Sequence, residues 1–247
     1  MNRLVAGVVG IVLLTTAAGV DAAAPPGDGA IEDYLGAFTE SDPAAAQALT
    51  EPDSPAFWYA AFKSAQAAAS EQAGQPLSPV TVKASDGAAE MCTDDSTLPC
   101  ATFAGFQAND DGQIVTFTIN TNDIAPRLGV GAEPVAVGAD ASARVLVSYR
   151  TVTNEALVVA VEVTVPGTGD LTPVATYQTP DGERLEAIDL LGLTTVDGAA
   201  AVILLVFPAT DPGGQVNWSP TIDGAPAPLV LSVPVLLGPG GSAPKKQ

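Results

Sequence analysis

Apolar residues near the start of the chain recur with the spacing of α-helices. Four of them follow the i, i+3, i+4, i+7 pattern of one buried helix face: Ile31, Tyr34, Leu35 and Phe38. Further along, Asp42 and Ser54 each stand directly before a proline, which is typical of a cap followed by the first turn of a helix. We therefore expect a short helix over residues 43–49 and a longer one over residues 55–73, ended by Gly74.

The pattern changes from helix to strand after the third helix. Short candidate strands cover residues 80–83, 88–92, 101–107 and 113–120. In the last of them, Val115, Phe117 and Ile119 alternate with polar residues, which indicates a half-buried strand. The sequence NDDG at residues 109–112 supplies the turn that precedes it.

The second half of the chain has no helical pattern and is rich in strands. Five apolar residues alternate strictly in one of them: Leu157, Val159, Val161, Val163 and Val165. The other expected strands cover residues 144–151, 174–179, 184–190, 200–207 and 229–235, with a hairpin turn at Pro180-Asp181-Gly182. This succession predicts a β-sandwich over residues 144–237, preceded by a linker over residues 128–143.

The same stretches resemble two known families. AIEDYLGAFTESDPAAAQALT and CATFAGFQANDDGQIVTFTIN resemble nuclear transport factor 2-like domains, in which helices pack into the concave face of a curved antiparallel sheet. ALVVAVEVTVPGTGDLTPVATYQTPDGERLEA, with VILLVFPA after it, resembles the immunoglobulin-like domains of secreted bacterial proteins. The resemblance implies an α+β domain over residues 23–127, followed by an all-β immunoglobulin-like sandwich. These strand and turn patterns carry no catalytic signature.

The first 22 residues have the order of a secretory signal peptide. Arg3 gives a positive start, residues 4–20 are uncharged and mostly apolar, and small residues precede a cleavage site between Ala22 and Ala23. An uncleaved membrane anchor is the alternative, although the apolar run is slightly short for a spanning helix. We therefore expect a secreted or extracytoplasmic protein without stable membrane insertion after cleavage. Residues 238–247 are expected to form a disordered tail.

The composition is acidic and turn-rich. The chain has 28 acidic and 9 basic residues, a net charge of −19, 24 glycines and 21 prolines. Such a surface repels nucleic acid, so we expect no nucleic-acid partner, whereas solubility or cationic partners are favoured.

Cys92 and Cys100 are the only cysteines of the chain. Their spacing matches neither a C-x-x-C redox centre nor the close ligand pairs of a zinc site. Export into an oxidising compartment favours a disulfide between them, which would close the base of a hairpin.

The absence of histidine excludes Ser-His-Asp and Cys-His catalysis and the H-E-x-x-H metalloproteases. Some proteins with the first resembled fold bind or transform small hydrophobic molecules in their cone. Here Tyr34, Trp58 and Tyr59, with Asp33 and Glu32, are the candidate ligand residues. The alternative is that the aromatic residues form the core.

Two further features have functional and structural interpretations. Asp94-Asp95 and Asp110-Asp111 could supply calcium ligands, but the spacing of an EF-hand loop is missing and turn chemistry explains them. Trp218 could be a platform for a sugar, or the anchor of a loop. We expect no catalytic residue, metal site or cofactor.

The favoured function is therefore an exported, non-enzymatic interaction or scaffold protein with a partner in the cell envelope or medium. The alternative is a carrier of small hydrophobic ligands, or a simple isomerase or dehydratase, that uses the cone pocket. An open cavity between helices and sheet would favour the alternative, and a filled one the scaffold.

Overall fold

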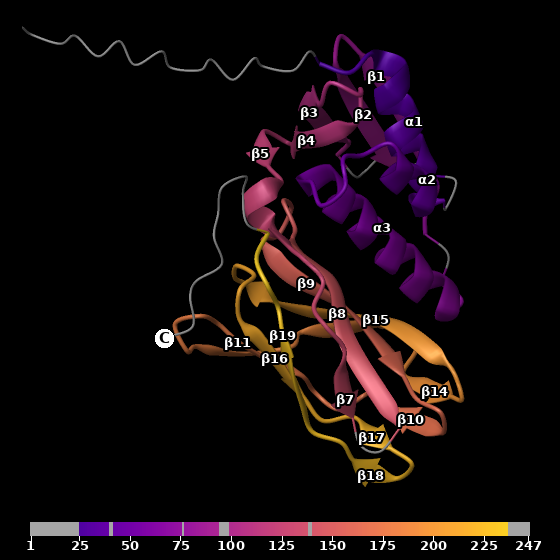
Figure 1. Cartoon of the computed structure of the whole chain (residues 1–247), viewed down its shortest axis with the longest axis vertical. Helices are drawn as coiled ribbons and strands as arrows, with labels where there is room; N and C mark the ends of the chain where they lie inside the picture. The colour runs from indigo at the N-terminus through magenta and orange to yellow at the C-terminus, as the bar shows by residue number, and fades with distance from the viewer. Residues whose placement is uncertain (1–24, 40–41, 76, 94–98, 138–139, 237–247) are drawn as a thin grey trace, which may run out of the picture.

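The computed structural model describes residues 25–39, 42–75, 77–93, 99–137 and 140–236. The predicted signal peptide with its cleavage site at Ala22–Ala23, and the predicted tail after residue 237, lie outside these residues. Figure 1 shows the helices and a first sheet at one end of the molecule and the other sheets at the opposite end.

The three predicted helices are confirmed. They are α1 (Asp28–Thr39), α2 (Pro43–Ala48) and α3 (Pro55–Gln72). Asp42 accepts a hydrogen bond from the Ala45 N–H at 3.1 Å, and Ser54 accepts one from the Phe57 N–H at 3.2 Å. Each cap thus satisfies a backbone donor that the first helical turn leaves unpaired. Gly74 follows α3 with φ +67°, a left-handed conformation that suits the end of a helix.

The strands of the described residues form four antiparallel sheets. The first has the order β1-β2-β3-β4-β5: Val80–Ser85, Ala88–Thr93, Ala101–Ala108, Ile114–Ile119 and Asn122–Asp123. The largest has the order β13-β15-β9-β8-β6, with β7 also paired to β8: Asp189–Gly192, Ala200–Ala209, Ala156–Thr164, Ala141–Arg150, Leu128–Gly129 and Val135–Val137.

Two smaller sheets complete the fold. One has the order β12-β11-β16-β19: Arg184–Glu186, Thr176–Gln178, Gln215–Trp218 and Leu229–Ser232. The other has the order β14-β10-β17-β18: Thr195–Asp197, Thr168–Asp170, Thr221–Ile222 and Ala225–Pro226. A single 3-10 turn among the described residues, η1 (Ala125–Arg127), connects β5 to β6.

The six-stranded sheet is buried on both faces. In β9, Val159 and Val161 face a cluster rich in valine, whereas Val158 and Ala160 face a cluster rich in aromatic rings. A bulge after Val145 in β8 shifts the register, so that the later residues of this strand turn to the aromatic side. This double burial explains why β9 and β15 are apolar almost throughout.

The valine cluster lies between the six-stranded sheet and the sheet β12-β11-β16-β19, a sandwich-like arrangement. Its valines are Val137, Val145, Val159, Val161, Val163, Val165, Val196, Val216 and Val233. The aromatic cluster lies on the other face of the six-stranded sheet, among the helices and the first sheet. Its rings are Tyr34, Phe38, Tyr59, Phe62, Phe103, Phe106, Phe117 and Tyr149.

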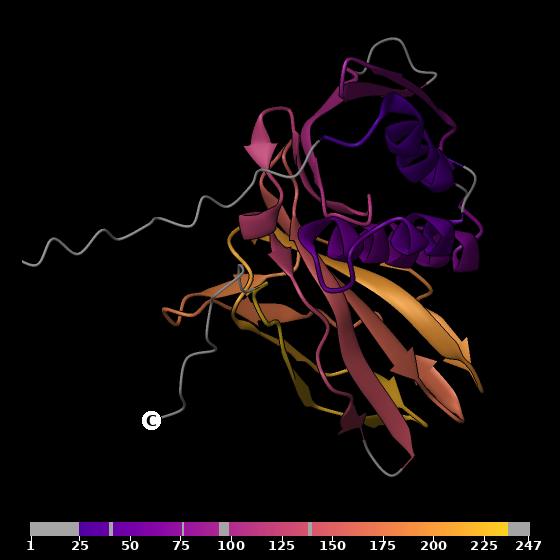
Figure 2. The same ribbon diagram turned by 45° about the horizontal axis from the view of Figure 1, so that its top comes forward.

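Helix α3 packs on two sheets at once. It contacts β4 of the first sheet, and β8, β13 and β15 of the six-stranded sheet. Figure 2 shows α3 lying across the six-stranded sheet, with the first sheet on its other side. The Gln72 side chain at the end of α3 accepts a hydrogen bond from the Val202 N–H of β15 at 2.9 Å, so this end of the helix is bonded to the larger sheet.

The predicted fold class, an α+β domain of helices on a curved sheet followed by an immunoglobulin-like sandwich, is therefore wrong. The described residues are predominantly strands in four antiparallel sheets, with three short helices and no separate helix-on-sheet domain. The physical reason is the second apolar face of the six-stranded sheet, on which α3 packs in addition to its contact with the first sheet. Strand alternation shows that a strand is buried, but not what covers it.

Residues 128–143, interpreted from the sequence as a linker, contribute β6, β7 and the first residues of β8. Val135–Val137 pairs with residues of β8, and Leu128 belongs to the aromatic cluster. The predicted domain boundaries at residues 127 and 144 stay a prediction, to which the unfolding experiments below apply.

The predicted disulfide is confirmed. Cys92 and Cys100 are bonded, with their Cα atoms 4.3 Å apart. They lie one residue beyond the pair Met91–Ala101, the last pair between β2 and β3, so the bond closes the base of this hairpin.

Candidate functional site

The aromatic residues predicted to line an internal ligand pocket lie in the core. Tyr34 is 0% exposed and Tyr59 is 7% exposed, whereas Trp58 is half-buried. Asp33 and Glu32 are exposed on α1, and a Glu32 carboxylate oxygen accepts the Ala84 N–H at 3.3 Å. The structure thus brings Tyr34 and Tyr59 into one cluster and leaves both carboxylates outside it.

Aromatic rings fill the space between the helices and the sheets. The ring centroid of Tyr59 lies 5.4 Å from those of Phe117 and Tyr149, in edge-to-face geometry. The Tyr34 hydroxyl donates to the Ala56 carbonyl at 2.9 Å. Burial, reinforced by neighbouring phenols, raises the pKa of Tyr34 and Tyr59 well above the ordinary value, so both stay neutral and neither can act as a base near pH 7.

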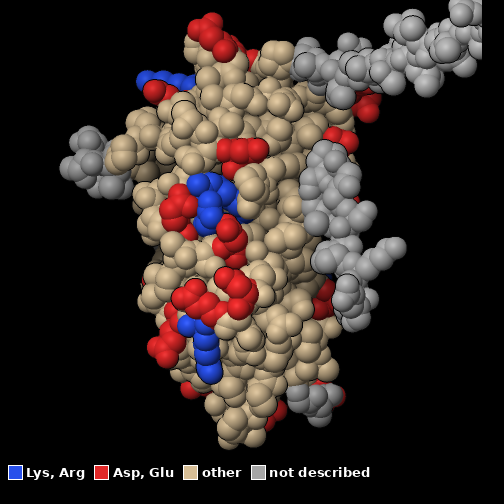
Figure 3. All heavy atoms as spheres, turned by 90° about the vertical axis from the view of Figure 1, so that its left-hand side faces the viewer, with Lys and Arg blue, Asp and Glu red and all other residues tan. Residues whose placement is uncertain are grey.

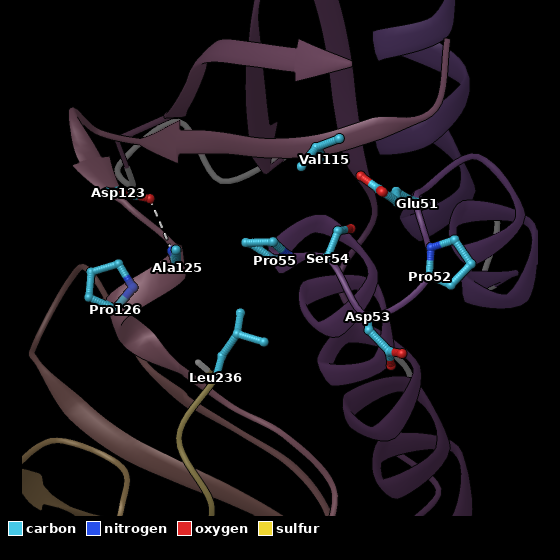
Figure 4. Close-up of a pocket in the computed structure, with 10 residues that line it drawn as sticks. All are labelled: Glu51, Pro52, Asp53, Ser54, Pro55, Val115, Asp123, Ala125, Pro126 and Leu236. Atoms are coloured by element: carbon cyan, nitrogen blue, oxygen red, sulfur yellow. Dashed lines mark hydrogen bonds between the residues drawn. The ribbon is translucent and has the colours of Figure 1, made fainter. Parts of the chain in front are cut away.

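A surface groove of about 580 Å³ opens where the helices, the first sheet and the sandwich meet. We name it the junction groove. Its lining residues are Glu51, Pro52, Asp53, Ser54, Pro55, Val115, Asp123, Ala125, Pro126 and Leu236. They come from the α2–α3 turn, β4, β5, η1 and the segment after β19, and Figure 4 shows them around one space. None of the predicted ligand residues lies in this groove.

Local backbone bonds hold the α2–α3 wall of the groove in place. The Glu51 N–H donates to the Ile114 carbonyl at 3.1 Å, and the Ile114 N–H donates to the Leu49 carbonyl at 3.0 Å. Asp53 has φ +61°, a left-handed conformation that aspartate tolerates better than most residues. This turn directs the chain into the Ser54 cap of α3 and leaves the Asp53 side chain exposed at the rim.

The opposite wall is built by β5 and η1. A carboxylate oxygen of Asp123 accepts the Ala125 N–H at 3.0 Å, and Pro126 follows in the 3-10 turn. Val115 and Leu236 add apolar surface from β4 and from the end of the described chain. The groove therefore combines an apolar interior with carboxylates on two sides.

A buried arginine anchors η1 to the sandwich. The Arg127 side chain is 7% exposed and pairs with Glu155 through two nitrogen–oxygen contacts of 3.0 and 3.1 Å. It also donates to the carbonyls of Arg150 and Thr151 and to Asn122 of β5. The bidentate geometry fits a planar guanidinium and fixes the orientation of the groove wall.

The partners of this arginine extend the network to the surface. Arg150 contacts Glu155 at 3.0 Å and also pairs with Asp211. The hydrogen bond from Arg127 holds the pKa of Glu155 below its ordinary value. Figure 3 shows a group of basic side chains flanked by acidic ones on one face of the molecule. The sequence gives no signal for these pairs, because 28 residues separate Arg127 from Glu155.

A second groove, of about 530 Å³, is lined by residues of β7 and of the facing sheet β12-β11-β16-β19. Val135, Val174 and Val230 line it and are 36%, 67% and 49% exposed. Trp218 also lines this groove but is only 3% exposed, and its indole N–H donates to the Pro173 carbonyl at 2.8 Å. The interpretation of Trp218 as a loop anchor is therefore confirmed.

Two of the four aspartates considered for calcium occupy a turn. Asp110 and Asp111 are exposed in the β3–β4 turn, where the Asn109 side chain accepts N–H groups from Asp111 and Gln113. Asp94-Asp95 lies outside the described residues. Across the part of the chain that the structure describes, no group of three or more acidic or cysteine side chains could hold a metal ion.

Comparisons with protein-family models, curated proteins and solved structures find no match to this chain. Within the described ranges, no helix is both long and apolar enough to cross a membrane. The disulfide is consistent with an extracytoplasmic location.

Proposed function

We propose that this protein is an exported, non-enzymatic interaction module that holds a partner in the junction groove. The observation that carries the proposal is a contrast between two spaces. The interior suggested for a small ligand is filled by packed rings, whereas the junction groove offers about 580 Å³ at the surface. The apolar N-terminal sequence and the disulfide support export.

Two properties of the groove support binding rather than catalysis. Its polar side chains are three carboxylates and the Ser54 hydroxyl, and Ser54 already serves as the cap of α3. Among the described residues that line it, none carries an imidazole, thiol or amine that could act as a general base or nucleophile beside them. Its walls are held by backbone bonds and by Arg127, which gives a rigid surface with little ordering cost on binding.

Site-specific photo-crosslinking in intact producing cells tests the proposal. A benzophenone amino acid replaces Ala125 in the junction groove, or Ala136 on the sandwich surface as the matched position. We expect one discrete crosslinked partner from position 125 and none of it from position 136. Crosslinks only from position 136, or the same crosslinks from both positions, would contradict the proposal.

A further inference from the structure

The junction groove has an apolar interior bordered by negative charge. Pro55, Val115 and Leu236 point into the space in Figure 4, and the carboxylates of Glu51 and Asp123 approach it from opposite sides. Asp53 adds a third carboxylate on the α2–α3 turn. Glu51 and Asp53 come from one turn and Asp123 from a segment about 70 residues later, so the fold brings carboxylates from two parts of the chain to one groove.

No described cation compensates these three carboxylates. Glu51 and Asp53 form no side-chain hydrogen bond or ion pair within the described ranges, and Asp123 bonds only to a backbone N–H. The nearby Arg127 is buried and already committed to Glu155. Because the whole chain carries a net charge of −19, a cation that enters the groove would relieve repulsion there.

A bare metal ion does not suit this arrangement, because the described side chains offer no group of three donors close enough to hold one. A cation on a long apolar stem suits it better, since such a side chain can cover apolar surface while its charged end stays at the rim. Three prolines also line the groove: Pro52, Pro55 and Pro126. Because proline has no backbone N–H to donate, this lining does not suit a partner that binds as an added β-strand, and it favours recognition of a side chain.

We propose that the partner inserts a lysine or arginine side chain from an exposed segment into the junction groove. The aliphatic stem lies against Pro55, Val115 and Leu236, and the charged end reaches the carboxylates of Glu51 and Asp123. This inference rests on the proposed function and names the chemistry of its partner.

Peptide binding to the full chain tests the inference. The probe is acetyl-(Pro-Lys-Val)3-amide, and its counterpart carries Nε-acetyllysine, which keeps the stem and removes the charge. Titration is followed by calorimetry, and by chemical-shift changes of the backbone amides of Glu51, Asp53 and Asp123. We expect the charged peptide to bind and to weaken at higher salt, while the acetylated peptide binds at least about tenfold more weakly.

Isosteric variants separate the groove from the general acidity of the chain. The groove variant is Glu51→Gln, Asp53→Asn and Asp123→Asn. The matched control is Glu133→Gln, Asp140→Asn and Asp197→Asn, which also removes three negative charges, all from exposed side chains. Asparagine tolerates the left-handed conformation at position 53 and can still accept the Ala125 N–H at position 123. We expect affinity for the charged peptide to fall about tenfold in the groove variant and less than about twofold in the control.

The outcomes distinguish this inference from the proposed function. Equal binding of both peptides, or equal losses in both variants, would overturn the cationic partner even where position 125 still crosslinks to a protein. Absence of crosslinks from position 125 would contradict the proposed function itself, whatever the peptides do.

Discussion

The two clusters that stabilise this protein are built from different residues on opposite faces of one sheet. The aromatic cluster holds five of the seven phenylalanines and three of the four tyrosines. The valine cluster relies on β-branched residues, with Tyr177, Phe207 and Trp218 as its only aromatic residues among those described. Large rings fill the irregular space between three helices and two sheets, whereas small branched side chains suit the regular spacing between facing sheets.

This difference shows that buried residues do not define domain boundaries by themselves. Val158 and Ala160 of β9, and Val202 and Leu204 of β15, belong to the aromatic cluster although they lie in the second half of the chain. The two clusters therefore share the strands of one sheet. We expect the two regions to depend on each other for stability, and the following predictions test this.

The largest losses in the free energy of unfolding are expected when one aromatic side chain in each cluster is replaced by alanine. Phe117 contacts Tyr59 and Phe106 at centroid distances of 5.4 and 5.1 Å, and Phe207 contacts Tyr177 at 5.4 Å. Phe117→Ala and Phe207→Ala should each lower the free energy of unfolding by about 3–5 kcal/mol. The loss at Phe117 should be larger, because ring pairs add about 0.5–1.5 kcal/mol each beyond burial.

The two tryptophans provide one fluorescent reporter for each region. Trp58 lies on α3 beside the aromatic cluster, and Trp218 lies in the valine cluster. The variants Trp218→Phe and Trp58→Phe leave one reporter each. In urea we expect coincident fluorescence transitions, and either ring truncation should shift both. Two separate transitions, each sensitive to one truncation, would instead support independent domains divided near residues 128–143.

Sequence reasoning succeeded where the signal was local. Asp42, Ser54 and their prolines predict two helix starts correctly, and Gly182 and the NDDG turn predict two hairpins. Capping and turn chemistry act within four residues, so these features are readable without the tertiary fold. Short strands such as β5, β6 and β17 were missed, because two residues carry no recognisable alternation.

The candidate site was not predictable in the same way. Residues from three parts of the chain that are distant in the sequence, 51–55, 115–126 and 236, meet in the junction groove, whereas EPDSP at residues 51–55 by itself indicates only a helix start. The aromatic residues are compatible with a pocket and with a core, since both can be lined by rings. Only the tertiary packing of Tyr34 and Tyr59 distinguishes the two.

Removal of the disulfide should cause the next largest loss in the free energy of unfolding. Replacing Cys92 and Cys100 by serine should lower the free energy of unfolding by about 2.5 kcal/mol, because the bond restricts the unfolded chain. The Trp58 and Trp218 transitions should both move if the regions depend on each other. A shift confined to Trp58 would support independent regions. Intact mass should rise by two hydrogens when the wild-type protein is reduced.

The pKa of Lys63 on α3 reports how strongly burial disfavours a charge at this position of the helix. Burial lowers its pKa to about 8, and its Nζ donates to the Gln66 side chain at 2.7 Å. Unfolded Lys63 therefore holds its proton above pH 8, where the folded side chain loses it, so the free energy of unfolding should rise with pH from 8 to about 9.5. Above that range the buried tyrosines, whose raised pKa values have the opposite effect, counteract the rise.

Lys63→Met should remove that rise and stabilise the protein at pH 7 by about 1 kcal/mol, less than the full shift implies because the side chain is partly exposed. Lys83→Met, at an exposed position of β1, is the control and should leave the slope unchanged. Urea titrations at several pH values measure both variants. A wild-type slope retained in Lys63→Met would contradict this assignment.

The smallest effect on the free energy of unfolding is expected from the ion pair between Arg127 and Glu155, which links the two regions. Glu155 pairs with the buried Arg127, which also holds Asn122 of the first sheet, and this pairing lowers the pKa of Glu155 below 4.5. A lowered folded-state pKa contributes stability that is complete above the ordinary value and is lost as the pH falls through the folded-state value.

Glu155→Gln should therefore destabilise the protein at pH 7 and reduce the loss of stability below pH 4.5. Glu162→Gln, which removes the partner of the exposed Arg144, should leave the acid slope nearly unchanged. Equal changes in the two variants, measured by urea unfolding from pH 7 downward, would show that the contact with Arg127 has no special role in joining the regions.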